Sequence, residues 1–277
     1  MIIDGHVHVW PDKIARIALG SPSDGLPRFG DGTTASAIES FRRAGIDKGV
    51  CLAVADTPER LESANRFVGG LDPEWFIGFG SVHPGRTPEE NVALLRENGL
   101  KGVKLHPLFQ GYALDDPKLW DVLAALEGEF PALFHVGPEF PGDPKGALAT
   151  PKMIREINAA FPKLEIIAAH FGGFNAWDEA MAEVHGLDVY LDTSWVPSVA
   201  TLDPKQVRSA IERHGAERVV FATDWPMADP EAEIAAIRGL GLSDTDTDAI
   251  LGGNFARLLG LDDDASTTRP LTPKETA

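Results

Sequence analysis

Eight short apolar segments recur along the chain, and amphipathic, helix-forming segments separate them. The apolar segments cover residues 2–9, 49–55, 75–83, 102–106, 132–136, 164–170, 189–194 and 218–224. Each is brief and nearly continuous in apolar residues, which is typical of parallel strands that are covered on both faces. Strand–helix alternation repeated eight times favours a closed (β/α)8 barrel over an open, doubly wound sheet.

Several intervening segments carry helix boundaries. Thr87, Thr150 and Asp203 each precede a proline, and a capping side chain followed by Pro is typical of a helix start. No Gly-rich dinucleotide fingerprint follows the first strand, which argues further against the open sheet. We therefore predict a single-domain α/β TIM barrel over residues 1–262. Residues 263–277 are polar and contain several Pro and Thr residues, which predicts a flexible tail.

The chain carries 42 acidic and 25 basic side chains, a formal net charge of −17. Such a surface repels phosphate backbones and anionic membranes, so we expect neither nucleic acid nor a membrane as a partner. We find no run of 18 apolar residues that could span a bilayer, and no secretory signal pattern at the N-terminus. The single cysteine, Cys51, suits a reducing compartment. Together these features predict a cytoplasmic protein.

Six of the eight histidines lie at or near the C-terminal end of a predicted strand, where barrel enzymes carry their active sites. His6 and His8 share one face of the first strand, because side chains alternate along a strand. The fifth and sixth predicted strands end at or near His135 and His170, and the eighth ends at Asp224. Imidazole and carboxylate groups gathered at one mouth are ligands for Zn, Mn, Fe, Ni or Co. The combination predicts a metal site, whereas each histidine alone is more typical of a hydrogen-bonded core residue.

The fourth segment ends in KLHP, which places Lys104 and His106 on one face of a strand. A lysine inside a barrel is costly unless it is paired. Lys104 could form an ion pair with Asp4 or Asp192, or it could bind a substrate carboxylate. His106 could reach the substrate.

The motifs DGHVHVW, GVKLHP, FHVG, AAHFGG, FATDWP and GGNFARLLGL, spread over nearly the whole chain, resemble those of the amidohydrolase superfamily. The resemblance is to its amidohydrolase-related branch, amidohydrolase 2, and the combination of motifs is specific although each alone is not. It implies a distorted (β/α)8 barrel and, for most members, metal-dependent hydrolysis of amides, lactones or esters. By position it makes His6, His8, His135 and Asp224 metal ligands, and Asp224 also a proton acceptor.

The resemblance leaves one or two metal ions open. The residue at the position of His170 is a second-metal ligand in binuclear members, and a catalytic residue that polarises substrate or water in mononuclear ones. Lys104 resembles a lysine that is carboxylated and bridges two metals in dihydroorotase-like members, and His106 is then a second-metal or substrate-binding residue. Family precedent is compatible with a homodimer.

We therefore predict a metal-dependent hydrolase of a C–N or C–O bond in a small amide, lactone or ester. A divalent ion, most simply Zn, lowers the pKa of its bound water to about 7, and Asp224 and His170 are the catalytic residues. The alternatives are a metal-dependent decarboxylase of a small carboxylic acid and a metal-free lactonase. A non-enzymatic binding barrel is least favoured, because binding alone needs no set of ligands that activates water.

Overall fold

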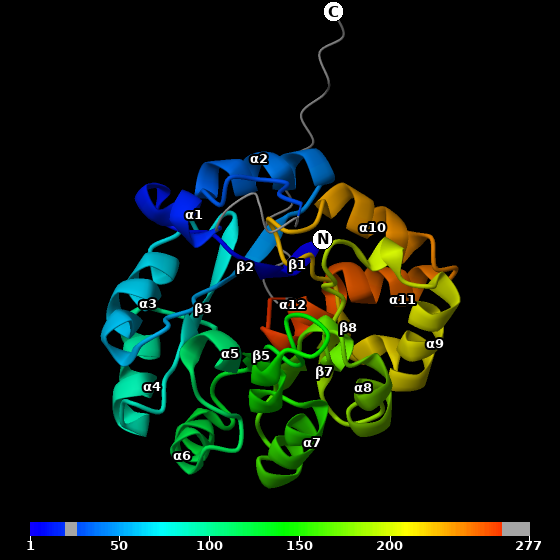
Figure 1. The fold of residues 1–277 in the computed structure, drawn as a ribbon. Coiled ribbons are helices and arrows are strands. Elements are labelled where there is room, and N and C mark those ends of the chain that lie inside the picture. The colour runs from blue at the N-terminus through cyan, green and yellow to red at the C-terminus, as the bar shows by residue number, and fades with distance from the viewer. Residues whose placement is uncertain (20–26, 262–277) are drawn as a thin grey trace, which may run out of the picture.

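The computed structural model describes residues 1–19 and 27–261, which form a ring of eight parallel strands surrounded by helices (Figure 1). The strands are β1 (Ile3–Val7), β2 (Lys48–Leu52), β3 (Phe76–Ser81), β4 (Gly102–Leu105), β5 (Ala132–Phe134), β6 (Ile166–Ala168), β7 (Tyr190–Asp192) and β8 (Val219–Val220). Each strand pairs with the next one along the chain, in order from β1 to β8. The predicted (β/α)8 barrel is confirmed. The predicted tail over 263–277 lies outside the described residues.

The barrel closes between β8 and β1 through single backbone hydrogen bonds instead of a regular ladder. Gly5 N–H donates to Phe221 O (2.8 Å), and His8 N–H donates to Trp225 O (2.8 Å). Trp225 N–H donates back to His6 O (3.2 Å). These bonds fix the backbone on either side of the two histidines of the first strand.

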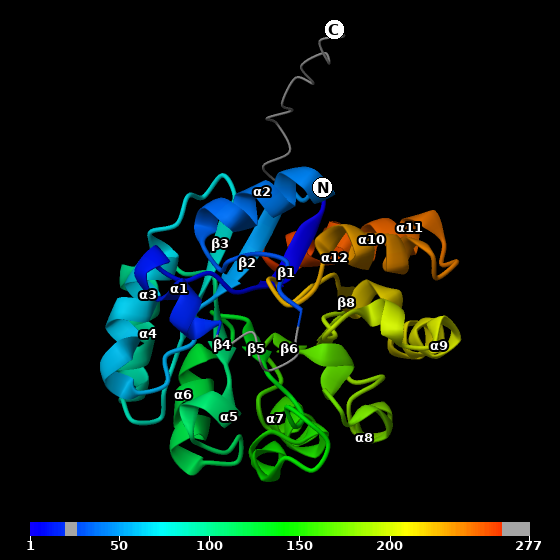
Figure 2. The same cartoon turned by 45° about the horizontal axis from the view of Figure 1, so that its top comes forward.

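Helices follow the strands, and most of them cover the outside of the ring, as both cartoon views show (Figures 1 and 2). They are α1 (Asp12–Ala18), α2 (Thr34–Ala44), α3 (Leu61–Gly69), α4 (Pro88–Glu97), α5 (Pro107–Gln110), α6 (Pro117–Leu126), α7 (Pro151–Ala160), α8 (Trp177–Glu183), α9 (Pro204–His214), α10 (Pro230–Arg238), α11 (Asp244–Asp248) and α12 (Asn254–Leu258). The predicted starts of α4, α7 and α9 are confirmed, because the side chains of Thr87, Thr150 and Asp203 accept hydrogen bonds from first-turn N–H groups.

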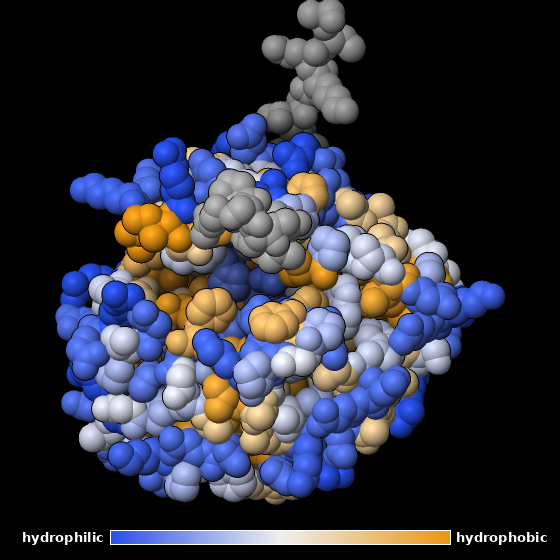
Figure 3. Space-filling view, in the orientation of Figure 1, coloured by the Kyte–Doolittle hydropathy of each residue, from blue (hydrophilic) through white to orange (hydrophobic). Residues whose placement is uncertain are grey.

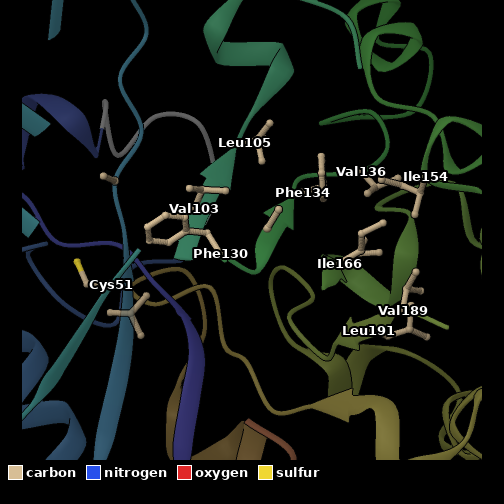
Figure 4. Close-up of a cluster of buried hydrophobic side chains, with 14 of the residues drawn as sticks. Cys51, Val103, Leu105, Phe130, Phe134, Val136, Ile154, Ile166, Val189 and Leu191 are labelled. Atoms are coloured by element: carbon tan, nitrogen blue, oxygen red, sulfur yellow. The ribbon is translucent and has the colours of Figure 1, made fainter. Parts of the chain in front are cut away.

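Two apolar clusters stabilise the barrel. The outer cluster lies between strands and helices and includes Cys51, Leu105 and Phe134 (Figure 4). The inner cluster is formed by Ile3, Val50, Leu52, Ile77, Phe79, Leu133, Ile167, Ala169, Val220, Phe255 and Ala256. In β1, Ile3 belongs to the inner cluster and Val7 to the outer one, so the strict alternation expected for this strand is not kept. The β1–β2 register shifts between Asp4 and Val7, which accounts for the change.

The inner cluster fills the end of the barrel away from the strand C-termini. Phe255 of α12 is fully buried, and its ring lies 6.1 Å from that of Phe79. Figure 1 shows α12 across the centre of the ring. In the part of the chain that the structure describes, no helix is both long enough and apolar enough to cross a membrane.

We predict that Phe255→Ala lowers the free energy of unfolding by about 3–5 kcal/mol, because it leaves a cavity in the inner cluster. Denaturant unfolding measures the change. Ile17→Ala is the control, since the Ile17 side chain is 79% exposed and its loss should change stability by less than about 0.5 kcal/mol. Equal unfolding midpoints for the two variants would contradict the assignment of Phe255 to the core.

Candidate metal centre

The C-terminal ends of four strands bring the predicted ligands together. Asp224 Oδ1, after β8, lies 3.5 Å from His6 Nε2 and 3.4 Å from His8 Nε2, at β1. His135, after β5, and His170, after β6, approach each other with 3.1 Å between Nδ1 of the first and Nε2 of the second. One atom each from His6, His170 and Asp224 lies within 4.8 Å of the others.

Two of these residues sit on strained backbone. His170 has φ 58° and Asp224 has φ 59°, and Phe171 continues the left-handed turn with φ 54°. Residues other than glycine adopt this region at a cost of about 1–3 kcal/mol each, and such strain concentrates at functional sites. Both residues lie in loops that follow strands, His170 after β6 and Asp224 after β8, and their side chains approach each other at the mouth of the barrel.

Three of the imidazoles each donate one ring N–H to a group that can only accept. The bonds run from His6 Nδ1 to Asp192 Oδ2 (2.8 Å), from His135 Nε2 to Gly137 O (3.2 Å) and from His170 Nδ1 to Ser194 O (3.2 Å). A carbonyl or carboxylate oxygen has no proton to give, so the donating nitrogen is known in each ring. The other nitrogen of each neutral ring is therefore an acceptor, and it faces the cluster.

The electrostatics keep these rings neutral. Burial lowers the pKa of His6, His135 and His170 below 6.5, and the Lys104 charge lowers it further, although the carboxylates of Asp192 and Asp224 oppose the shift for His170. Burial acts to raise the pKa of Asp224, but the neighbouring imidazoles of His6 and His8, with a hydrogen bond from His8, outweigh it and lower that pKa. The cluster thus holds neutral imidazoles beside an ionised carboxylate.

This arrangement fits a divalent metal ion. His135 Nδ1 faces His170 Nε2, and His6 Nε2 faces Asp224 Oδ1, with acceptor opposite acceptor in both pairs. Opposed lone pairs repel unless a cation lies among them, and nitrogen and oxygen donors of this kind bind Zn²⁺ or Mn²⁺. Each ring is also oriented by its outer hydrogen bond, as metal-binding histidines are.

Lys104 lies at the floor of the cluster and is fully buried, with Nζ 3.2 Å from His6 Nε2. Burial lowers the pKa of Lys104 to about 8, although Asp224 and Asp192 favour its charged form. The ion pair considered with Asp4 or Asp192 does not form. Asp4 instead accepts hydrogen bonds from Thr223, and Asp192 accepts from His6.

A second group of possible ligands lies outside the first. Glu139 Oε1 is 3.6 Å from His106 Nε2 and 3.8 Å from His135 Nε2. The His106 and His135 rings stack in parallel, with centroids 4.1 Å apart and planes 9° apart. An ion bound to an imidazole lies near the ring plane, and two parallel planes share no such point. His135 Nε2 also carries the proton donated to Gly137 O, so this group does not suit a shared ion.

Sequence reasoning missed several residues that organise the site. Ser194 bonds to His170 through both its carbonyl and its hydroxyl, and Glu139 lies over two of the rings. Asp192 appeared only as a partner for Lys104. The signals were weak: Asp192 and Ser194 alternate along the end of β7, and Glu139 stands four residues after His135 in a loop. Nothing in the sequence relates Asp192 to His6, or Glu139 to His106.

Comparison with known families shows to which family the chain belongs. Residues 3–261 match a family model described as amidohydrolase, the amidohydrolase 2 family, and the chain belongs to this family. It is an enzyme-type barrel of the amidohydrolase superfamily, as its motifs predicted.

Solved structures with the same fold include a 2,6-dihydroxybenzoate decarboxylase from Rhizobium, with 17% identity and a TM-score of 0.72 over 94% of this chain and 99% of that one. A dihydroxybenzoic acid decarboxylase from Polaromonas, solved with manganese and 2-nitroresorcinol, has 17% identity and a TM-score of 0.71 over 94% and 97%. A protein from Acinetobacter baumannii described as a probable 2-pyrone-4,6-dicarboxylic acid hydrolase has 18% identity and a TM-score of 0.65 over 94% and 99%. At these sequence identities, the structural similarity shows that the chain shares the fold of these proteins.

We predict that Asp192→Asn weakens metal binding about 10–100-fold while preserving the fold. Asp192 Oδ1 accepts from His170 N–H, Ser194 N–H and the Ser194 hydroxyl, so the amide oxygen of Asn should keep that place. The amide NH2 then faces His6 Nδ1 and forces the proton of that ring onto Nε2, the nitrogen that faces the cluster.

Competition with a chromophoric chelator measures the affinity, and circular dichroism checks the fold. Asp188→Asn is the matched control, because Asp188 is exposed just before β7. Wild-type affinity in the Asp192 variant would show that this carboxylate does not set the ring proton.

Proposed function

We propose that this protein is a metal-dependent hydrolase that cleaves a C–N or C–O bond in a small amide, lactone or ester. The observation that carries the proposal is the convergence of unprotonated ring nitrogens and one carboxylate at the mouth of the barrel. His6, His8, His135 and Asp224 would hold one divalent ion, with Zn²⁺ as the first candidate for a histidine-rich set. The bound ion would supply a water molecule acidic enough to ionise near neutral pH.

The residues around that water divide the remaining tasks. Asp224 is an ionised carboxylate at the edge of the cluster, 16% exposed, so it can accept the proton of the water and return it to a leaving group. His170 presents Nε2 as an acceptor, since its Nδ1–H is donated to Ser194. We therefore assign His170 to holding the water or the ion, and not to donating a hydrogen bond to the substrate carbonyl.

A single ion is the arrangement that we favour. One ligand atom each from His6, His170 and Asp224 lies within 4.8 Å of the others, whereas the parallel rings of His106 and His135 do not suit a second ion. Lys104 enters this proposal as an amine beside His6, with no bridging role.

Cys51 is a buried free cysteine, which supports a reducing, cytoplasmic location.

Decarboxylation is the second candidate. The buried Lys104 amine could bind a substrate carboxylate next to the same ligand atoms, and two proteins that share this fold are named as decarboxylases. Assaying both carbon dioxide and hydrolysis products across lactones, amides and aromatic acids separates the two reactions.

We expect about one equivalent of divalent metal per chain in protein purified without chelators. The double variant His6→Ala/His8→Ala should lose it, because both rings face Asp224. Elemental analysis measures the content. His83→Ala is the control, since His83 also follows a strand but contacts Gly85 and Gln110. A wild type that takes up no metal even when incubated with Zn²⁺ or Mn²⁺, and that is active with chelator present, would identify a metal-free lactonase instead.

We predict that Asp224→Asn lowers kcat by about 10²–10⁴-fold, because the amide cannot accept the proton of the water. Steady-state kinetics on the first substrate found measure the loss, and thermal unfolding checks that the fold survives. Near-normal turnover in folded, metal-loaded Asp224→Asn would remove this residue from the mechanism.

A further inference from the structure

We propose that Glu139 and His106 form a substrate-recognition subsite for a neutral or cationic group that donates a hydrogen bond, such as an amide N–H. The inference rests on the proposed function and deepens it. It states which kind of group the substrate carries at the end away from the metal cluster.

The first observation is the lack of hydrogen-bond partners around the His106 ring. Its side chain is 9% exposed, and among the described residues its Nδ1 has no hydrogen-bond partner. Its Nε2 lies 3.6 Å from Glu139 Oε1, longer than a hydrogen bond. Buried polar atoms are almost always paired, so an imidazole left unpaired at the mouth of an active site indicates a missing ligand.

The second observation concerns the position of Glu139. Its side chain is 42% exposed, and its Oε1 lies 3.8 Å from His135 Nε2, on the side of that ring opposite the cluster-facing Nδ1. His135 Nε2–H is already donated to Gly137 O. The carboxylate therefore keeps lone pairs available for a donor that enters from the mouth.

One exposed phenyl ring contacts this polar pair, and a second follows it directly in the chain. The Phe109 ring meets the His106 ring edge-on, with centroids 4.4 Å apart, and remains 62% exposed. Phe140 follows Glu139 in the chain and is 59% exposed. Figure 3 shows apolar surface beside the hollow at the centre of this face. Apolar walls with a few polar groups are typical of small-molecule sites, and they fit an aryl or alkyl group that carries the donor.

The charge of Glu139 gives the subsite its selectivity. An amide N–H or an ammonium group would donate to the carboxylate, whereas a substrate carboxylate at the same place would meet a like charge. We therefore infer that the substrate is not a dicarboxylate with an acidic group at this end. Its anionic or carbonyl end would instead face Lys104 and the cluster.

The test uses benzohydroxamates, whose hydroxamate group anchors to the metal, with a carbamoyl or a carboxyl group at the meta or para position. Titration calorimetry at pH 8 gives the affinity of metal-loaded protein for each. Of the two positions, we consider the one at which the carbamoyl probe binds wild type more tightly. At that position we expect the carbamoyl probe to bind about tenfold more tightly than the carboxyl probe. Glu139→Gln should bring the ratio of the two affinities to within about twofold, mainly because the variant binds the carboxyl probe more tightly than wild type does.

Glu89→Gln is the matched control, because Glu89 is exposed in the first turn of α4 and the change in net charge is the same. It should keep the tenfold ratio. His106→Phe keeps the stacked ring without its nitrogens, and it should weaken carbamoyl binding while leaving the metal content unchanged.

Two results would overturn the proposal: a wild type that prefers the carboxyl probes, or a ratio that Glu139→Gln leaves unchanged. Loss of a metal equivalent in Glu139→Gln would also overturn it, because the group would then be an ion site. Repeating the titrations on metal-stripped protein with benzamides that carry the same carbamoyl or carboxyl groups, and that need no metal as an anchor, separates this inference from the proposed function. If the wild type binds no metal, the proposed function fails, and a shift of the ratio by Glu139→Gln still supports the subsite.

Discussion

The arrangement of the site depends on one buried carboxylate. Asp192 accepts a ring N–H from His6 with one oxygen, and with the other it accepts the backbone N–H groups of His170 and Ser194. The bonds join β1, the strained turn after β6, and the end of β7. A fully buried carboxylate is stable only when donors surround it, so this group fixes three segments relative to one another and fixes which nitrogen of His6 carries its proton.

Hydrogen bonds of this kind give the two nitrogens of each histidine ring different roles. Outward ring nitrogens donate to Asp192, Gly137 and Ser194, and inward nitrogens are acceptors, of which His6 Nε2 lies 3.2 Å from Lys104 Nζ. The left-handed backbone at His170 and Asp224 costs free energy that the barrel must supply from its packing. Part of the stability of the fold therefore goes into holding acceptors close together, an arrangement that a bound cation would stabilise.

The sequence predicted what depends on strand ends and missed what depends on contacts across the barrel. His6, His8, His135, His170 and Asp224 were predicted to lie close together, and they do, because the C-termini of parallel strands meet at one mouth. The roles of Asp192 and Glu139 depend on side-chain geometry between segments far apart in the chain, which carries no local pattern. The register shift in β1 was also missed, because alternation assumes a regular ladder.

The closing contacts of the barrel have a consequence for synthesis in the cell. Gly5 N–H bonds to Phe221 O, and the Phe255 side chain lies where a side chain on Gly5 would have to be. His6 meets Asp224 from the other end of the chain. During translation, β1 therefore gains its partner next to β8 only after nearly all of the described chain has been synthesised. The nascent protein cannot bring His6 to Asp224 early, so metal loading at the proposed site would be a late event that follows closure of the ring.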